Sequence, residues 1–123
     1  MNKHKKTVLI VDDSLLIMER MIPILEEIDN ISFVVQAGSF REAVEVLRTL
    51  NPDMVLLDIN LPDKSGIDLL HFIRAKQMEI TVLMITNQTD SYYMEICHKL
   101  GAKYFLDKSK DIDLISGVLA TAC

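Results

Sequence analysis

The sequence predicts a single α/β domain in which a parallel sheet is covered by helices on both faces. Five short apolar runs alternate with five helix-like stretches along the 123 residues, and this alternation is typical of parallel strands joined by right-handed crossover helices. Three of the runs, VLIV, MVLL and VLMI, lack the alternating pattern of a half-exposed strand. They are therefore expected to be central strands that are buried on both faces.

The apolar runs define the expected strands, and the stretches between them define the expected helices. Strands are predicted at residues 7–11, 32–37, 53–58, 80–86 and 103–107. Helices are predicted at residues 14–28, 39–50, 65–76, 90–100 and 111–121.

Capping residues support these helix boundaries. Ser39, with Glu42 three residues later, predicts a capping box at the start of the second helix. Ser65 and Asp90 are predicted to cap the third and fourth helices. Gly101 follows the fourth helix at the position where a glycine commonly ends a helix.

The first helix carries more apolar surface than contact with one sheet requires. Its two stripes are Ile17, Met21, Ile24 and Ile28, and Leu15, Met18 and Ile22. One stripe is expected to face the sheet. The other either meets a partner protein or is buried at the rim of the core, and the sequence favours neither alternative.

Composition and charge exclude several functional classes. The net charge is −5, with 18 acidic and 13 basic residues, which argues against direct nucleic-acid binding by this domain. The apolar runs are too short to span a membrane. The basic segment MNKHKK is not followed by a cleavage site for a signal peptidase. We therefore expect one cytoplasmic domain over residues 1–123, with residues 1–6 as a flexible basic tail.

Polar residues follow the predicted strands at or just beyond their ends. These residues are Asp12, Asp13, Asp58, Thr86 and Lys108. Because the carboxyl ends of parallel strands meet at one edge of the sheet, the five side chains are expected to lie together. Clustered carboxylates repel each other unless a cation lies among them, and hard oxygen ligands suit Mg²⁺. The sequence therefore predicts a Mg²⁺ site at this edge, shared with an anionic group.

The segments IVDDS, VLLDINLPDKSG, MIT and FLDKS together resemble the receiver (CheY-like) domain of bacterial two-component response regulators. The resemblance extends from about Lys6 to the last helix. It implies a five-stranded parallel sheet in the order 2-1-3-4-5 flanked by five helices, the doubly wound, flavodoxin-like arrangement. It also implies that a histidine kinase or a histidine phosphotransfer protein is the partner.

The resemblance implies a role for each site residue. Asp58 would accept a phosphoryl group. Asp13 and Asp58 would bind Mg²⁺ directly, Asp12 would act through a water molecule, and the backbone carbonyl of Asn60 would complete the set of protein ligands. Such a domain is a phosphoryl acceptor that assists its own phosphorylation and dephosphorylation, and it is not an enzyme with a diffusing product.

The resemblance also implies how the modification is read out. Lys108 would pair with the phosphoryl oxygens, and Thr86 would donate its hydroxyl to one of them. Phe105 falls at the aromatic switch position. Phosphorylation would then shift a two-state equilibrium at the face formed by the fourth helix, the fifth strand and the fifth helix.

Three positions depart from the commonest family pattern. Ser109 follows Lys108, where the family usually has a proline preceded by a cis bond. Asn87 occupies a position where a small residue is more usual, so Asn87 and the neighbouring Gln88 are expected to affect access to the phosphate. Phe105 has no hydroxyl, so its switch would depend on packing.

Other interpretations remain open. The domain could be a scaffold that is never phosphorylated, or a Mg²⁺-dependent phosphohydrolase with an aspartate nucleophile. The phosphohydrolase is disfavoured because the first strand of those enzymes is followed by a DxD motif, whereas Asp12 and Asp13 are adjacent. A stand-alone receiver and the receiver part of a DNA-binding regulator fit equally well. Tyr92 and Leu114 point away from the apolar stripes of their helices and could form a homodimer face. Asp63, in the loop after Pro62, is interpreted as a surface turn residue.

Overall fold

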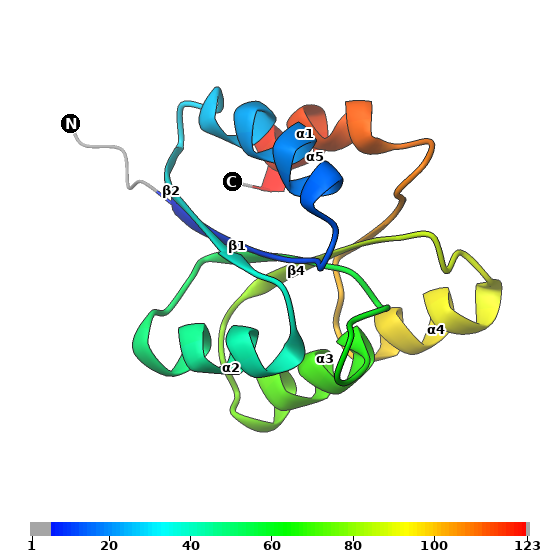
Figure 1. The fold of residues 1–123 in the computed structure, drawn as a ribbon. Helices are drawn as coiled ribbons and strands as arrows, with labels where there is room; N and C mark the ends of the chain where they lie inside the picture. The colour runs from blue at the N-terminus through cyan, green and yellow to red at the C-terminus, as the bar shows by residue number, and fades with distance from the viewer. Residues whose placement is uncertain (1–5, 123) are drawn as a thin grey trace.

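The computed structural model describes residues 6–122, and its centre is a five-stranded parallel sheet (Figure 1). The strands are β1 (Lys6–Val11), β2 (Ile31–Ala37), β3 (Met54–Leu57), β4 (Thr81–Thr86) and β5 (Tyr104–Asp107). Their order in the sheet is β2-β1-β3-β4-β5, and all four neighbouring pairs are parallel. This confirms the order implied by the resemblance, and it makes β1, β3 and β4 the interior strands.

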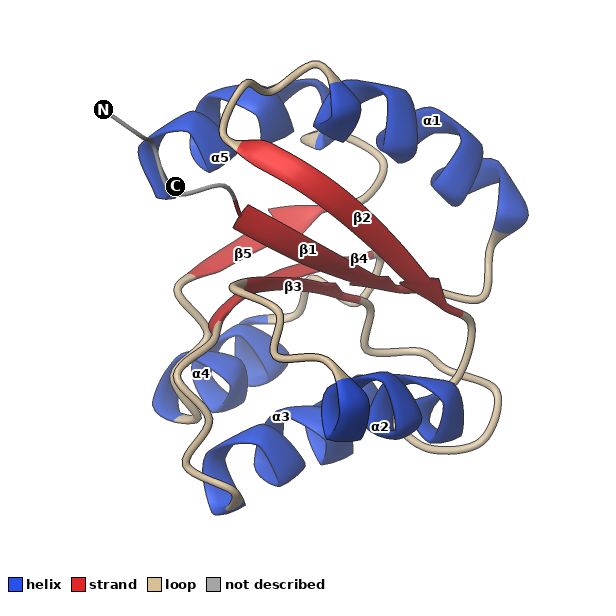
Figure 2. Cartoon of the chain, turned by 90° about the vertical axis from the view of Figure 1, so that its left-hand side faces the viewer, coloured by secondary structure: helices blue, strands red, loops and turns tan. Residues whose placement is uncertain are grey.

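Helices cover both faces of the sheet. They are α1 (Leu15–Glu26), α2 (Phe40–Thr49), α3 (Gly66–Ala75), α4 (Ser91–Lys99) and α5 (Ile115–Ala122), with a short 3₁₀ turn, η1 (Ile112–Leu114), before α5. Figures 1 and 2 show α1 and α5 on one face, and α2, α3 and α4 on the other. The predicted doubly wound architecture is therefore confirmed, although the last predicted helix begins as a 3₁₀ turn.

The side chains of β1 alternate between two separate cores. Val8 and Ile10 pack with residues of α1 and α5, whereas Leu9 and Val11 pack with residues of α2, α3 and α4. All four residues of β3 are buried. The central strands are thus buried on both faces, as their unbroken apolar runs predicted.

The starts of α2 and α4 differ from the predictions. The Ser39 hydroxyl accepts a hydrogen bond from Glu42 N at 3.1 Å. The Glu42 carboxylate accepts from Gly38 N at 2.6 Å instead of from Ser39 N, so the predicted capping box is only half formed. Asp90 is the N-cap residue of α4, but its side chain makes no capping hydrogen bond. The predicted N-cap position of Asp90 is therefore confirmed, but its side chain does not satisfy a backbone N–H of the helix.

The predicted caps at Ser65 and Gly101 are confirmed. The Ser65 hydroxyl accepts from Ile67 N at 3.0 Å, and the Asp68 carboxylate accepts from Ser65 N at 3.1 Å, which makes a reciprocal capping box at the start of α3. Gly101 has φ +91°, the left-handed conformation that ends a helix at low cost in glycine.

Most of the apolar surface of α1 is buried. Ile17 and Met21 of one predicted stripe are buried, and so is Met18 of the other. The alternative in which both stripes lie against the core is therefore the better description. The exceptions are Leu15, which is 77% exposed, and Leu16, which is 67% exposed and belonged to neither predicted stripe.

The predicted basic tail extends one residue too far. Lys6 is the first residue of β1, and its backbone N–H donates to the Asn30 carbonyl at 2.7 Å. The rest of the predicted tail, residues 1–5, lies outside the described residues. Tyr92 and Leu114 are 66% and 56% exposed, as predicted. Among the helices of residues 6–122, none has the length and apolar character needed to cross a membrane.

Candidate functional site

Strand register brings three aspartates together at the carboxyl edge of the sheet. Val11 at the end of β1 is paired with Leu57 at the end of β3. Beyond this pair, Asp58 N donates to the Val11 carbonyl at 3.0 Å. One carboxylate oxygen each from Asp12, Asp13 and Asp58 consequently lies within 4.8 Å of the other two. The predicted acidic cluster is thus present in the structure.

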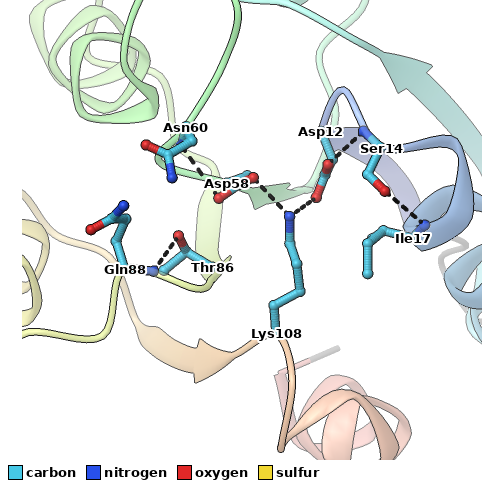
Figure 3. Close-up of polar contacts among 8 residues, drawn as sticks. All are labelled: Asp12, Ser14, Ile17, Asp58, Asn60, Thr86, Gln88 and Lys108. Atoms are coloured by element: carbon cyan, nitrogen blue, oxygen red, sulfur yellow. Dashed lines mark hydrogen bonds and ion pairs between the residues drawn. The ribbon is translucent and has the colours of Figure 1, made fainter.

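Lys108 completes the cluster from the end of β5, the edge strand next to β4. Its backbone N–H donates to the Thr86 carbonyl at 2.9 Å, which extends the pairing of β4 with β5 by one residue. Its side chain then points toward Asp58 and Asp12, as Figure 3 shows. The Nζ atom lies 2.7 Å from Asp12 Oδ2 and 2.8 Å from Asp58 Oδ2. One ammonium group therefore bridges two buried carboxylates.

Backbone donors fix the second oxygen of each bridged carboxylate. Asp12 Oδ1 accepts from Ser14 N at 2.8 Å, and Asp58 Oδ1 accepts from Asn60 N at 3.3 Å. Asp12 and Asp58 are each only 4% exposed, whereas Asp13 is exposed. The site thus combines two oriented acids with one acid that is open to solvent.

The charges in the site shift two pKa values. Burial raises the pKa of Asp12, and the hydrogen bonds from Lys108 and Ser14 offset only part of this effect. Burial also disfavours the charged form of Lys108, but its hydrogen bonds with Asp12 and Asp58 outweigh burial and raise the pKa of Lys108. Lys108 therefore stays cationic at neutral pH. The cluster thus combines three carboxyl groups with one ammonium, and this ratio suits a divalent cation.

The donor atoms fit Mg²⁺ better than a transition metal. The cluster offers three carboxylates, and hard oxygen ligands of this kind are the ones that Mg²⁺ prefers. The group contains neither histidine nor cysteine, the ligands typical of zinc sites.

Thr86 and Phe105 lie on the same side of the sheet. Thr86 is fully buried, and its Oγ1 atom accepts from Gln88 N at 3.1 Å. Phe105 is paired with Met84, which lies two residues before Thr86 and so faces the same way. The Phe105 ring is half-buried against the core on the α4 side. It also lines a groove between α4 and β5.

Gln88 and Asn87 flank the site differently. Gln88 is half-buried, whereas Asn87 is exposed. In Figure 3, Asn60, Thr86 and Gln88 lie at the Asp58 end of the network, and Ser14 and Ile17 lie at the Asp12 end.

Hydrogen bonds from side chains close the loop that follows Lys108. The peptide bond between Lys108 and Ser109 is trans, like every peptide bond in the described residues. Ser109 N and Ser109 Oγ both donate to Asp107 Oδ1, at 2.8 and 2.7 Å. Asp107 N donates to Asp111 Oδ2 at 2.8 Å. The hydroxyl and the N–H of Ser109 lower the pKa of Asp107.

Two residues near the site were not identified from the sequence. Ser14 both orients Asp12 and caps α1 by accepting from Ile17 N at 3.3 Å, and a serine just before an apolar helix could have signalled this. Asp63 is exposed, as expected of a turn residue, but its carboxylate accepts from the backbone N–H groups of Phe40 and Arg41. No local pattern indicated that contact.

Comparison with known proteins identifies the family. The model of the response regulator receiver domain matches residues 8–119, and the chain belongs to this family. The transcriptional regulatory protein DegU of Brevibacillus brevis is 30% identical over 122 residues, which cover 98% of this chain and 52% of the relative. The chain thus spans about half the length of the curated relatives it matches.

Solved structures share the same fold. A DNA-binding response regulator of the LuxR family from Staphylococcus aureus superimposes with a TM-score of 0.86 at 20% identity, covering 94% of this chain and 97% of that one. The Mn²⁺-bound form of response regulator Rcp1 superimposes with a TM-score of 0.83 at 22% identity, covering 94% and 92%.

Proposed function

We propose that this receiver domain is a phosphorylation switch in a two-component signalling pathway and that Asp58 is the phosphoryl acceptor. The donor would be a histidine kinase or a histidine phosphotransfer protein. The observation that carries the proposal is the position of Lys108 Nζ, within 2.8 Å of both Asp12 and Asp58 at the edge of the sheet. A lysine held among carboxylates suits a site that must accept a further anionic group.

The residues that would hold Mg²⁺ are Asp12, Asp13, Asp58 and, through its backbone carbonyl, Asn60. When bound, the ion would neutralise charge on the transferring phosphoryl group. The three clustered carboxylates support this assignment, as does the Mn²⁺-bound form of the structurally similar Rcp1.

The chemistry of transfer explains why a lysine faces the acceptor. A carboxylate and a phosphoryl group repel each other, so charge neutralisation and in-line placement supply most of the catalysis. An oxygen of Asp58 would form a bond to phosphorus while the bond from phosphorus to the donor imidazole breaks. The imidazole nitrogen keeps the electron pair of that bond and takes up a proton. Lys108 already contacts Asp58, so its ammonium can pair with the transferred oxygens with little movement.

The readout would depend on Thr86 and Phe105. The Thr86 hydroxyl, which accepts from Gln88 N, can still donate its own hydrogen to a phosphoryl oxygen. If Thr86 moves toward the phosphoryl group, it leaves space on the face of the sheet that Phe105 shares. Phe105 would then shift the face formed by α4, β5 and α5 between two states. A complete switch, from 1:99 to 99:1, requires about 5.5 kcal/mol of preference for one state.

Partners and the lifetime of the phosphate are further parts of the proposal. Asn87 and Gln88 would control how water and small phosphodonors reach Asp58. The exposed Tyr92 and Leu114 would contribute to a homodimer or docking face. This chain would act either alone or as the receiver half of a DNA-binding regulator. The second alternative is supported by DegU, a transcriptional regulatory protein of which the match covers 52%.

The proposal is tested by incubating the protein with Mg²⁺ and acetyl phosphate and measuring the intact mass. We expect the wild-type protein to gain one phosphoryl group per chain. The Asp58→Ala variant, and wild type incubated with EDTA, should gain none. Steady turnover of a phosphomonoester would indicate a phosphohydrolase instead. A protein that binds Mg²⁺ and forms no adduct with either acetyl phosphate or beryllofluoride would be a scaffold, and the proposal would be wrong.

A further inference from the structure

The carboxylate of Asp63 joins the loop that follows Asp58 to the first turn of α2. Asp63 Oδ1 accepts from Phe40 N at 2.8 Å, and Asp63 Oδ2 accepts from Arg41 N at 2.9 Å. These donors are backbone groups at a helix N-terminus, which have no partner within the helix and attract negative charge. We call this pair of hydrogen bonds the Asp63 clasp. It spans 23 residues of sequence.

The clasp holds the tip of the loop between β3 and α3, and two other contacts hold its base. Gly66 N donates to the Ile59 carbonyl at 2.7 Å, and Asn60 N donates to the Asp58 carboxylate at 3.3 Å. Asn60 therefore lies between a closed base and an anchored tip.

The helix end that receives the clasp is itself tied to the other side of the site. Asp12 N donates to the carbonyl of Ala37 at 3.0 Å. Ala37 lies only three residues before Phe40, where α2 begins. The Glu42 carboxylate accepts from Gly38 N, and this hydrogen bond joins α2 to the turn that leads from β2. The clasp thus links the segment that carries Asn60 to the segment that supports Asp12.

From this geometry we propose that Asp63 is a positioning residue for the Mg²⁺ site. The inference rests on the proposed function, because it assumes that the Asn60 carbonyl is a metal ligand. With the clasp formed, the loop is ordered before the ion arrives. Without the clasp, Mg²⁺ binding must also order the loop, and the loss of conformational entropy lowers the affinity for the ion. Outer contacts that orient metal ligands commonly change metal affinity by about 10- to 100-fold when they are removed.

A purely structural role for Asp63, as a cap of α2, makes a different prediction. The Ser39 hydroxyl caps the same helix end by accepting from Glu42 N at 3.1 Å, but within residues 6–122 it forms no hydrogen bond to the loop. Ser39→Ala is therefore a matched control that weakens the start of α2 while the clasp remains. If Asp63 only caps the helix, Asp63→Ala and Ser39→Ala should affect Mg²⁺ binding alike.

The experiment compares wild type, Asp63→Ala, Asp63→Asn and Ser39→Ala as whole chains. Calorimetric titration with MgCl₂ gives the affinity, and urea unfolding in EDTA gives the stability of each variant. We expect Asp63→Ala to weaken Mg²⁺ binding at least about tenfold, with Ser39→Ala close to wild type. Asp63→Asn should be intermediate, since it keeps an acceptor oxygen and loses the charge. Phosphorylation by acetyl phosphate should slow in Asp63→Ala at low Mg²⁺ and recover at saturating Mg²⁺.

Each contrary outcome has a distinct meaning. Equal loss of affinity in Asp63→Ala and Ser39→Ala, or unchanged affinity in Asp63→Ala, would overturn the positioning role while the proposed function stands. A wild type that binds Mg²⁺ but is never phosphorylated on Asp58 would overturn the proposed function alone. A wild type that binds no Mg²⁺ would overturn both.

Discussion

The Nζ atom of Lys108 lies 2.8 Å from Oδ2 of Asp58, although the two residues are 50 positions apart in the chain. The contact crosses the end of β4, which lies between β3 and β5 in the sheet. The same atom lies 2.7 Å from Asp12 Oδ2. Lys108 thus stabilises two buried carboxylates, and its removal should affect stability as well as phosphorylation.

Lys108→Ala should lower the free energy of unfolding. Asp12 and Asp58 would remain buried and would lose their charged partner, and buried polar groups that lose a partner typically cost about 1–3 kcal/mol. If the same carboxylates hold Mg²⁺ as proposed, added Mg²⁺ should restore part of this loss, because the ion would supply the missing positive charge. Urea unfolding with and without Mg²⁺ measures both effects.

Lys110→Ala is the control for this change, since it also removes one lysine from the same loop but the Lys110 side chain is exposed. We expect it to unfold like wild type. If Lys108→Ala also unfolded like wild type in EDTA, the two short ion pairs would contribute nothing net to stability.

The fold and the main site could be predicted because they depend on strong local patterns. Unbroken apolar runs mark the central strands, and the first polar residue after such a run lies at the edge of the sheet. Asp12, Asp58 and Thr86 are located by this rule alone, whereas the first polar residue after the last apolar run is Asp107 and not Lys108. The strand order and the individual roles came from the resemblance.

The contacts that could not be predicted from the sequence depend on which of several neighbouring N–H groups donates to a given carboxylate. Glu42 could reach the N–H of Ser39 or of Gly38, and only the folded turn favours Gly38. The partners of Asp63 are 22 and 23 residues away, so no local pattern shows the clasp. Such contacts are set by tertiary structure.

Gly66→Ala should destabilise the protein and disturb Asp58. A Cβ atom at Gly66 would overlap the carbonyl oxygen of Asp58 and would lie 3.0 Å from Ile59 Cα. Because backbone atoms cannot rotate away, the loop must shift, and overpacking of this kind typically costs about 1–3 kcal/mol. Urea unfolding measures the cost, and amide NMR shifts of Asp58 and Asn60 report the displacement.

Gly117→Ala gives the opposite expectation within the same protein. A Cβ atom there would meet nothing within 4 Å, and Gly117 lies inside α5. Alanine in a helix interior is favoured over glycine by about 0.5–1 kcal/mol, so this variant should be more stable than wild type. Equal stabilisation by both substitutions would show that α3 does not approach Asp58 as closely as the structure has it.

Ser109→Ala should raise the pKa of Asp107. The Ser109 hydroxyl is the largest cause of the lowered pKa of this carboxyl group, followed by the Ser109 N–H, and the substitution removes only the hydroxyl. Because the folded pKa lies below the unfolded value, Asp107 stabilises the fold above that value and loses its contribution as the pH falls through the folded pKa. Carboxyl-carbon NMR titration of wild type and variant measures the change. An unchanged Asp107 pKa would mean that the bond from Ser109 Oγ is not formed in solution.

Asp12→Asn should make the protein more stable in EDTA at neutral pH. Burial raises the pKa of Asp12 in the folded state, so its ionisation favours the unfolded chain. Wild type therefore loses stability as the pH rises from the unfolded value of about 3.9 through the raised folded pKa. Asparagine does not ionise, and Lys108 keeps its bond to Asp58. The advantage of the variant should be largest above the folded pKa of Asp12 and should shrink as the pH falls toward the unfolded value.

Urea unfolding of both proteins in EDTA at a series of pH values measures this difference. A variant less stable than wild type at neutral pH would mean that the ion pair between Asp12 and Lys108 outweighs the cost of burying the carboxylate. Saturating Mg²⁺ should reverse the order of stability if the Asp12 carboxylate helps to hold the ion, because ligand binding stabilises the protein that binds more tightly. Such a reversal would separate two roles of Asp12: a buried carboxylate that lowers the stability of the fold, and a charge that strengthens the proposed metal site.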